Sequence, residues 1–157
     1  ISSLMAQIKQ HCNLSYPNSD INYAVAENVK ETMKMDSDPS LIPAIINVIN
    51  NAIMASAKRN KHQIELGAQV SHQHCELMVR DFGKGFSDEH FQQLGDTPVR
   101  SEQGLGVAMF LSNASLERLG GTLSLSNHHQ GGALVKITLP LISTELENSR
   151  QTLVGHS

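Results

Sequence analysis

The chain has 157 residues, the length of one ordinary domain with a single hydrophobic core. It carries 12 basic and 15 acidic residues and only 4% aromatic residues, a composition that does not support a nucleic-acid groove or a platform for stacking RNA bases. Two cysteines, Cys12 and Cys75, are too few and too far apart for a disulfide framework, and they favour a reducing compartment.

Apolar stretches are interrupted well before the ~18 residues that a membrane span needs, and no signal-peptide pattern opens the chain. We therefore expect this piece to make no direct membrane contact. Because the chain begins with Ile1 instead of Met, we interpret it as an excised part of a longer protein.

The first third of the chain predicts a helix and two strands. Residues 1–12 carry apolar side chains at helical spacing, and a polar break follows at residues 17–20. Alternating apolar and polar residues predict a half-buried strand over residues 21–27. A second, short strand is expected over residues 32–35.

The most strongly patterned element is a helix over residues 41–58, which follows a helix-start sequence at residues 38–40. Its apolar positions share one broad face: Leu41, Ile42, Ile45, Ile46, Ile49, Ala52 and Ile53. A hairpin with strands over residues 64–70 and 75–79 is expected next.

The last third predicts helices and a second pair of strands. Residues 88–94 favour a short helix, and residues 95–103 lack periodicity, so we expect a mobile loop there. A helix over residues 105–119 and strands over residues 122–126 and 133–139 follow. This order predicts an α+β fold, a two-layer α/β sandwich whose mixed, mostly antiparallel sheet is covered on one face by about three helices.

We divide the chain into three parts. Residues 1–37 supply the N-terminal helix and first strands of the same domain as residues 38–142, which carry the motifs with chemical potential. Residues 143–157 form a polar C-terminal tail that we expect to be frayed.

Asp81 follows an apolar strand and precedes two glycines, Gly83 and Gly85. A carboxylate at a strand end beside a tight turn can meet a flat ligand that approaches the backbone. It can accept a hydrogen bond from an exocyclic amine such as that of adenine, worth ~1.5–3 kcal/mol because one partner is charged. The alternative is an Asx-type turn before a glycine, and this motif alone does not decide between the two.

Asn47 and Asn51 lie four positions apart, so they share one face of the predicted helix. Their amide oxygens can converge on a Mg²⁺ ion whose charge is mostly balanced by phosphates. Asn50 points elsewhere, and we expect it to face solvent or to play a supporting role. The alternative is that these asparagines are only the wet face of an amphipathic helix.

The segment Gly104-Leu105-Gly106 stands between the expected loop and the helix after it. Small residues at a helix N-terminus expose backbone N–H groups, and the helix dipole favours phosphate there. The alternative is a flexible hinge. Gln103 is a candidate for a further amide oxygen on the metal, and Arg100 for neutralising the outer phosphates.

Taken in order, INVINNA, DFGKG and QGLGV resemble the N, G1 and G2 boxes of the GHKL ATP-binding superfamily, specifically the catalytic ATP-binding domain of sensor histidine kinases. The resemblance covers about residues 38–140 and implies the Bergerat-type fold. LERLGGTLSLSN followed by GGALVKITLP resembles the last helix and hairpin of that family. LSNASLERLGG is also similar to redox-responsive two-component sensor kinases.

The resemblance implies a role for each box. Asp81 would bind the adenine amine, and Asn47 and Asn51, the catalytic candidates, would hold Mg²⁺ and phosphates, with Gln103 as a further metal ligand. Residues 95–103 would form the ATP lid. The residues assigned to ATP are Asn47, Asn51, Asp81, Gly83, Gly85, Arg100, Gln103, Gly104, Leu105 and Gly106.

The implied reaction is transfer of the γ-phosphate of Mg-ATP to a histidine, and from there to a response regulator in a bacterial two-component phosphorelay. None of the eight histidines lies in the short motif that marks a phosphoacceptor, so the acceptor belongs to a helical hairpin elsewhere in the same protein. We do not expect the chain to autophosphorylate alone. Asn47 stands where gyrase-like and mismatch-repair ATPases place a glutamate base for water, which argues against those classes.

The resemblance also implies a setting. The parent protein is expected to be a homodimer anchored in the bacterial inner membrane, with this domain in the cytoplasm.

Departures from the family pattern leave a second interpretation open. Glu102 stands where the G2 box often has a further glycine, and Met54 replaces a common basic residue, for which Lys58 is a candidate substitute. The chain would then be a degenerate nucleotide-binding or interaction module without kinase activity. A third interpretation is a zinc site at His72, His74 and Cys75, or at the pair 128–129, although both clusters fall on predicted turns.

Overall fold

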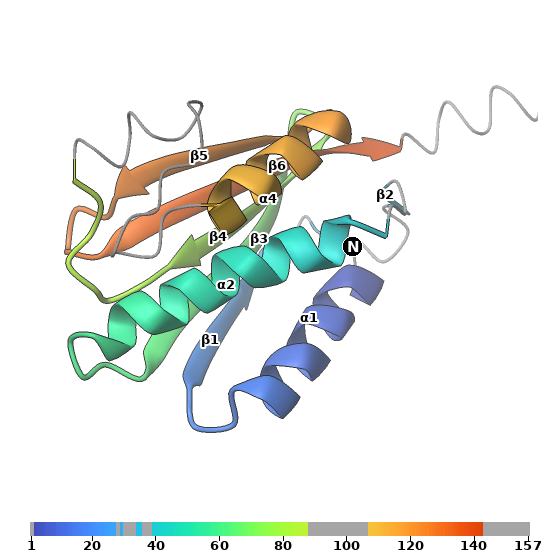
Figure 1. The fold of residues 1–157 in the computed structure, drawn as a ribbon. Coiled ribbons are helices and arrows are strands. Elements are labelled where there is room, and N and C mark those ends of the chain that lie inside the picture. Colours follow the sequence, from blue (N-terminus) through green and yellow to red (C-terminus); the bar gives the residue numbers. More distant parts are fainter. Residues whose placement is uncertain (1, 28, 30–33, 36–38, 88–106, 143–157) are drawn as a thin grey trace, which may run out of the picture.

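The computed structural model describes residues 2–27, 29, 34–35, 39–87 and 107–142. Six strands form one sheet, and three helices cover one of its faces (Figure 1). The strands are β1 (Asp20–Val25), β2 (Lys34–Met35), β3 (Gln63–Ser71), β4 (His74–Arg80), β5 (Thr122–Asn127) and β6 (Ala133–Ile142). The helices are α1 (Ser2–Ser15), α2 (Leu41–Ala57) and α4 (Val107–Arg118).

The strand order is β1-β3-β4-β6-β2, and β5 also pairs with β6. Only β1 and β3, among the described strands, pair in parallel, and the other pairings are antiparallel. The parallel pair needs a crossover connection, and α2 lies within the segment that supplies it. The predicted two-layer sandwich with a mixed, mostly antiparallel sheet is confirmed.

The β3–β4 hairpin closes through a two-residue loop, His72-Gln73, in which both residues have positive φ angles of 50° and 65°. Two positive φ angles are typical of a type I′ turn, whose twist matches that of the flanking strands. The hairpin was predicted, and the structure extends each strand by one residue at each end.

The core lies between the sheet and the helices. Alternate residues of each strand point into it, so the inward side chains of neighbouring strands meet in register. The inward side chains of the central hairpin are Ile64, Leu66, Ala68, Cys75, Leu77 and Val79.

The buried face of α2 differs in part from the prediction. Ala44 and Val48 are buried, whereas Ile42, Ile46 and Ile53 are only half-buried. The centre of the buried stripe is therefore turned toward Ala44 and Val48. The helix itself, from Leu41 to Ala57, ends within one residue of the predicted limit.

Three element ends differ from the sequence prediction by two or three residues. Helix α1 runs three residues beyond residue 12. Strand β1 ends at Val25, whose side chain is 44% exposed because β1 is the edge strand of the sheet. Strand β6 runs to Ile142 because its last residues pair with β2.

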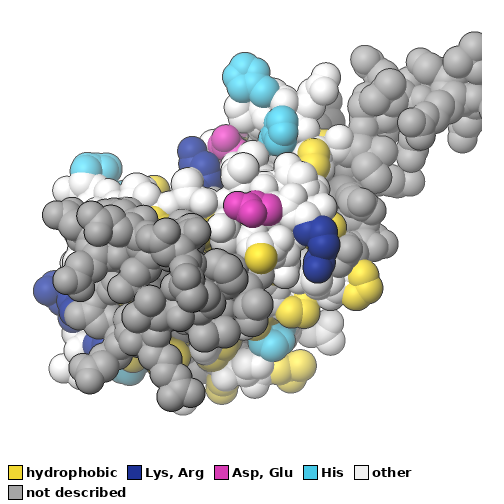
Figure 2. Space-filling view, turned by 45° about the horizontal axis from the view of Figure 1, so that its top comes forward, with side chains coloured by type: hydrophobic (Ala, Val, Ile, Leu, Met, Phe, Trp, Pro, Cys, Tyr) yellow, Lys and Arg dark blue, Asp and Glu magenta, His cyan; other side chains and the backbone are white. Residues whose placement is uncertain are grey.

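The helix expected over residues 88–94, the loop expected over residues 95–103 and the tail at residues 143–157 lie outside the described residues. Within the described ranges, no helix has the length and apolarity needed to cross a membrane. Both cysteines are buried and carry free thiols. On the face shown in Figure 2, the described acidic and basic side chains are dispersed and do not gather into a patch of one charge.

Candidate functional site

Asp81 lies just past the end of β4, where the sheet ladder has brought it beside the first residue of β6. Its backbone N–H donates to the carbonyl oxygen of Ala133 at 3.0 Å. Its carboxylate oxygen Oδ1 accepts two backbone N–H bonds, from Gly83 at 2.9 Å and from Ala133 at 3.0 Å. Both bonds use Oδ1, so the carboxylate is held in one orientation, and Oδ2 has no hydrogen-bond partner among the described residues.

This carboxylate is 6% exposed, and its burial has an electrostatic cost. Burial raises the pKa of Asp81 from its ordinary value of 3.8, while the N–H bonds from Ala133 and Gly83 and the charge of Arg80 oppose the rise. The net direction is upward. A buried acceptor with a raised pKa is typical of a functional site, because the fold alone gains little by burying it.

The two glycines after Asp81 are each required by the protein backbone itself. A Cβ on Gly83 would lie 2.8 Å from the carbonyl oxygen of Ala55 in α2. Gly85 has a φ angle of 85°, and a Cβ there would lie 2.7 Å from the side-chain oxygen of Asn127. The sequence analysis assigned both glycines to ATP binding, and the structure adds that a larger residue at either position would displace the turn.

Two side chains that the sequence analysis did not single out hold this turn from opposite sides. Ser56, 1% exposed in α2, accepts the backbone N–H of Phe82 at 3.0 Å. Asn127, at the end of β5, accepts the N–H of Phe86 at 2.7 Å and donates to the carbonyl oxygen of Phe86 at 3.0 Å. These bonds join residues 26 and 41 positions apart, so no local sequence pattern signals them.

The three α2 asparagines have different surroundings. Asn47 is exposed. Asn51 is half-buried, and within the described part of the chain its side-chain nitrogen Nδ2 is buried without a hydrogen-bond partner. A buried polar atom with no protein partner is uncommon and calls for a ligand or an ordered water.

Asn50 was expected to face solvent or to play a supporting role, and the structure favours the supporting role. Its oxygen Oδ1 accepts a hydrogen bond from the Tyr16 hydroxyl at 2.9 Å, and its Nδ2 donates to the sulfur of Met54 at 3.5 Å. Asn50 is half-buried, and because Tyr16 follows α1, this bond ties that end of α1 to α2.

The candidate residues lie in sequence along one face of helix α2. Ala55 touches Gly83 of the turn, and Asn51 lies four residues earlier on the same helix face. Asn47 lies a further turn away, and each turn advances the helix by about 5.4 Å. The order of groups along α2 is therefore the Asp81 turn, then Asn51, then Asn47.

The remaining predicted site residues, Arg100 and the segment 103–106, lie outside the described residues. Helix α4 begins at Val107, directly after Gly106. At the other end of α4, Arg118 donates to the hydroxyl of Ser40 at 2.9 Å.

The zinc interpretation is not supported. Within the described ranges, no three His, Cys, Asp or Glu side chains gather closely enough to hold a metal ion. Cys75 points into the core, and burial raises the pKa of its thiol to about 11, so the thiol keeps its proton at neutral pH. His74 bonds the carbonyl oxygen of His72 at 2.9 Å, as a polar turn does.

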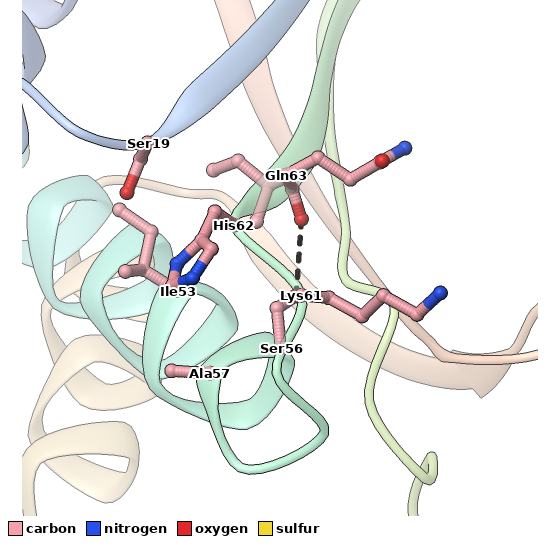
Figure 3. Close-up of a pocket in the computed structure, with 8 residues that line it drawn as sticks. Ser19, Ile53, Ser56, Ala57, Lys61, His62 and Gln63 are labelled. Carbon is pink, nitrogen blue, oxygen red and sulfur yellow. Dashed lines mark hydrogen bonds between the residues drawn. The ribbon is translucent and has the colours of Figure 1, made fainter.

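Two of the hollows lined by described residues contain neither Asp81 nor the α2 asparagines. One, of about 360 Å³, lies on the outer face of the sheet and is lined in part by Gly67, Met78 and Arg80. The other, of about 20 Å³, lies beside Ser56 at the end of α2 (Figure 3).

Comparison with known families gives a match over most of this region. Residues 37–143 match the family model described as histidine kinase-, DNA gyrase B-, and HSP90-like ATPase. The chain belongs to this family. Its relatives within the ATPase family are sensor histidine kinases, as the sequence motifs predicted.

Individual relatives agree with this assignment. Sporulation kinase B of Bacillus subtilis is 28% identical over 144 residues, which cover 89% of this chain and 33% of that protein. Sensor protein LytS of Enterococcus faecalis is 25% identical over 152 residues, which cover 94% of this chain and 26% of that protein. The chain thus spans a third or less of the length of these curated relatives.

Solved structures share the fold. The ATP-binding domain of PrrB from Mycobacterium tuberculosis superposes with a TM-score of 0.66 at 25% identity, covering 90% of this chain and 93% of that one. A mycobacterial sensor histidine kinase, MprB, superposes with a TM-score of 0.71 at 18% identity, covering 89% and 93%. The fold is that of the ATP-binding domains of histidine kinases.

Proposed function

We propose that this chain is the ATP-binding catalytic domain of a two-component sensor histidine kinase. In this proposal it binds Mg-ATP and transfers the γ-phosphate to a histidine on a helical hairpin elsewhere in the same protein. A response regulator then receives the phosphate. The parent protein would be a homodimer anchored in the bacterial inner membrane, with this domain in the cytoplasm.

The observation that carries the proposal is the buried carboxylate of Asp81. Its Oδ1 is occupied by two backbone N–H groups, and its Oδ2 is left to accept a further donor. The exocyclic amine of adenine is such a donor, and a charged acceptor strengthens the bond. Full-length ShkA, a solved structure with a TM-score of 0.73 to this chain, was crystallised with AMPPNP.

The asparagines of α2 suit the other end of the nucleotide. The unpartnered Nδ2 of Asn51 is a donor that a phosphate oxygen can satisfy, and its Oδ1 is a neutral ligand of the kind that Mg²⁺ accepts. Asn47 and Gln103 are the further candidates for Mg²⁺. Bound Mg²⁺ would supply positive charge that offsets the negative charge of the transferring phosphoryl group.

The proposed mechanism is mainly one of positioning. Asp81 fixes the base, and Asn51 and Asn47 fix the phosphates one and two helical turns away, so that the γ-phosphorus is presented to the incoming imidazole. The bond from the γ-phosphorus to its bridging oxygen breaks as the bond to the imidazole nitrogen forms, and ADP leaves. Gly104, Leu105 and Gly106 would contribute backbone N–H groups to the triphosphate, and Arg100 a positive charge.

One observation favours the second candidate function, a nucleotide-binding or interaction module without transfer. Met54 stands where the family commonly has a basic residue, and its side chain is 50% exposed with its sulfur bonded to Asn50. A thioether supplies no positive charge to a phosphate. Lys58 is exposed just past the end of α2 and would have to supply that charge instead.

A transfer assay separates the two functions. The chain is mixed with Mg²⁺, γ-labelled ATP and the helical hairpin of the same protein, and label on histidine is identified by its loss in acid. The kinase function predicts acid-labile label on the hairpin. Retained ATP binding without transferred label would contradict the kinase function and support the second candidate.

Asn51→Ala is expected to weaken Mg-ATP binding about five-fold, the loss of roughly 1 kcal/mol of neutral hydrogen bonding and ligation. Binding measured in EDTA should change less, because one of the two lost contacts needs the metal. The free energy of unfolding should not fall, since the mutation removes a buried N–H group that has no partner among the described residues. Titration calorimetry with and without Mg²⁺ measures the affinities.

Asn13→Ala is the matched control, because Asn13 is exposed on α1. Its ATP affinity should equal that of the unmodified chain. If Asn51→Ala behaves like this control in Mg²⁺, the asparagines of α2 are only a solvated helix face.

A further inference from the structure

We propose that Ser56 is a positioning residue for the nucleotide site. It fixes the Asp81 turn against α2 and thereby sets the distance between the adenine contact and the phosphate contacts. This inference rests on the proposed function. It concerns a residue that does not itself touch the nucleotide in that proposal.

The first argument is the pattern of bonds along the turn. The β4–β6 ladder ends where the backbone of Asp81 pairs with Ala133, so the amides beyond this point lack strand partners. Side chains supply acceptors for three of them: Ser56 for Phe82, Asp81 for Gly83, and Asn127 for Phe86. Of these three acceptors, Ser56 is the one carried by α2.

The second argument is the single proton of the hydroxyl. Ser56 Oγ donates that proton to the carbonyl oxygen of Gln63 at 3.1 Å (Figure 3). It therefore acts as an acceptor toward Phe82 N–H, at 3.0 Å. One buried oxygen thus joins three segments, namely the last turn of α2, the start of β3 and the turn after β4. A buried hydroxyl that lost these two partners would destabilise the fold. The positions of the three segments around Ser56 are therefore fixed relative to one another.

The third argument is the close backbone approach next to this bond. A Cβ on Gly83 would lie 2.8 Å from the carbonyl oxygen of Ala55, the residue before Ser56. No side-chain layer separates the turn from the helix here. A shift of the last turn of α2 is therefore passed directly to Gly83, whose N–H holds the Asp81 carboxylate.

The small hollow beside Ser56 gives the test its conservative variant. It measures about 20 Å³ and is lined in part by Ile53 and Ala57 of α2 (Figure 3). That space is about one water molecule in size. A threonine at position 56 keeps the hydroxyl, and the hollow offers room for its additional methyl group.

The test compares Ser56→Ala, Ser56→Thr and the control Ser124→Ala, in which an exposed serine of β5 is changed. Each protein is titrated with Mg-ATP, with adenosine, and with Mg²⁺ and inorganic tripolyphosphate. Ser56→Ala should lower the affinities for ATP and adenosine about five-fold, as expected for the loss of one supporting hydrogen bond. Its affinity for tripolyphosphate should stay within about two-fold of that of the unmodified chain. Ser56→Thr and Ser124→Ala should match the unmodified chain within about two-fold on all three.

If Ser56 only contributed to general stability, Ser56→Ala would not affect adenosine and tripolyphosphate binding differently. It would weaken tripolyphosphate and adenosine equally, in proportion to the loss of folded protein. In a double-mutant cycle with Asp81→Asn, the adenosine losses should not add, because both changes act on one contact. Equal losses on both ligand fragments, or additive losses in the cycle, would overturn the inference.

A readout without nucleotide separates this inference from the proposed function. In the free protein, Ser56→Ala should raise amide hydrogen exchange at Phe82 and Gly83 about ten-fold or more, relative to exchange in the core of β4. Unchanged exchange at these amides overturns the positioning role even if ATP binds. If exchange rises as expected but the unmodified chain binds no ATP, the proposed nucleotide function is wrong, while the role of Ser56 in holding the Asp81 turn against α2 is supported.

Discussion

Asp81→Asn is expected to lower the affinity for ATP by at least about 10-fold, which corresponds to ~1.4 kcal/mol. The asparagine keeps the shape of the side chain, and its amide oxygen can still accept the N–H groups of Gly83 and Ala133. What it loses is the charged acceptor at Oδ2. The adenine amine would then face an NH₂ group, and two donors cannot bond each other.

The same change should not destabilise the free protein at neutral pH. Burial raises the pKa of Asp81, so the native state holds the proton more tightly than the unfolded chain. The stability contribution of this group is therefore present in full below the ordinary pKa and is lost as the pH rises through the raised, folded-state pKa. An asparagine does not ionise, so the Asp81→Asn variant does not lose stability in this way as the pH rises. The free energy of unfolding of the variant, compared with that of the unmodified chain, should therefore increase from acid to neutral pH.

Calorimetric titration with ATP and urea unfolding at several pH values measure the two effects. Asp20→Asn is the matched control, since Asp20 is an exposed aspartate at the start of β1. The control should leave ATP affinity unchanged. Equal ATP affinities for Asp81→Asn and the unmodified chain would remove the adenine assignment, and with it the main support for the proposed function.

The fold was predictable where structure depends on local pattern. Helix α2 and the β3–β4 hairpin follow from a 3.6-residue period and a two-residue period within single segments, and both were located to within one or two residues. Element ends were less predictable, because pairing with distant segments decides them. Strand β6 is longer than its own pattern indicates since β2, about a hundred residues earlier in the chain, pairs with its end.

The candidate site was predictable only in its motifs. Asp81 and the α2 asparagines stand out in the sequence because they lie in the short motifs DFGKG and INVINNA. The groups that hold Asp81 in place do not: Ser56 bonds across 26 positions, Asn127 across 41 and Ala133 across 52. A serine inside an amphipathic helix or an asparagine at a strand end has many ordinary uses, so nothing in the sequence distinguished these two.

Gly132→Ala is expected to give the largest loss of stability, above about 4 kcal/mol, a range reserved for a few specific mechanisms. Two such mechanisms act together at this position. Gly132 has a φ angle of 86°, which L-residues rarely adopt, and a Cβ there would overlap the carbonyl oxygen of Asp81. A backbone oxygen cannot turn aside as a side chain can, so the Asp81 turn or the β6 start must move.

Gly131→Ala separates the two mechanisms. Gly131 also has a positive φ angle, of 101°, but a Cβ there would meet no atom within 4 Å. It should therefore show only the cost of the backbone conformation, about 1–2 kcal/mol. Urea unfolding of both variants gives the difference. Equal losses for the two variants would mean that adjustment of the surrounding backbone relieves the overlap.

The pair also tests how closely the hairpin turn is coupled to the site. Ala133, the next residue after Gly132, accepts the backbone N–H of Asp81 with its carbonyl oxygen and donates its own N–H to the Asp81 carboxylate. A displaced Gly132 should therefore misplace Oδ2 and reduce ATP affinity in whatever fraction of Gly132→Ala remains folded. Gly131→Ala, whose added methyl group points into open space, should bind ATP normally once corrected for its unfolded fraction. If both folded variants bind ATP normally, Asp81 is held in place without help from the β6 start.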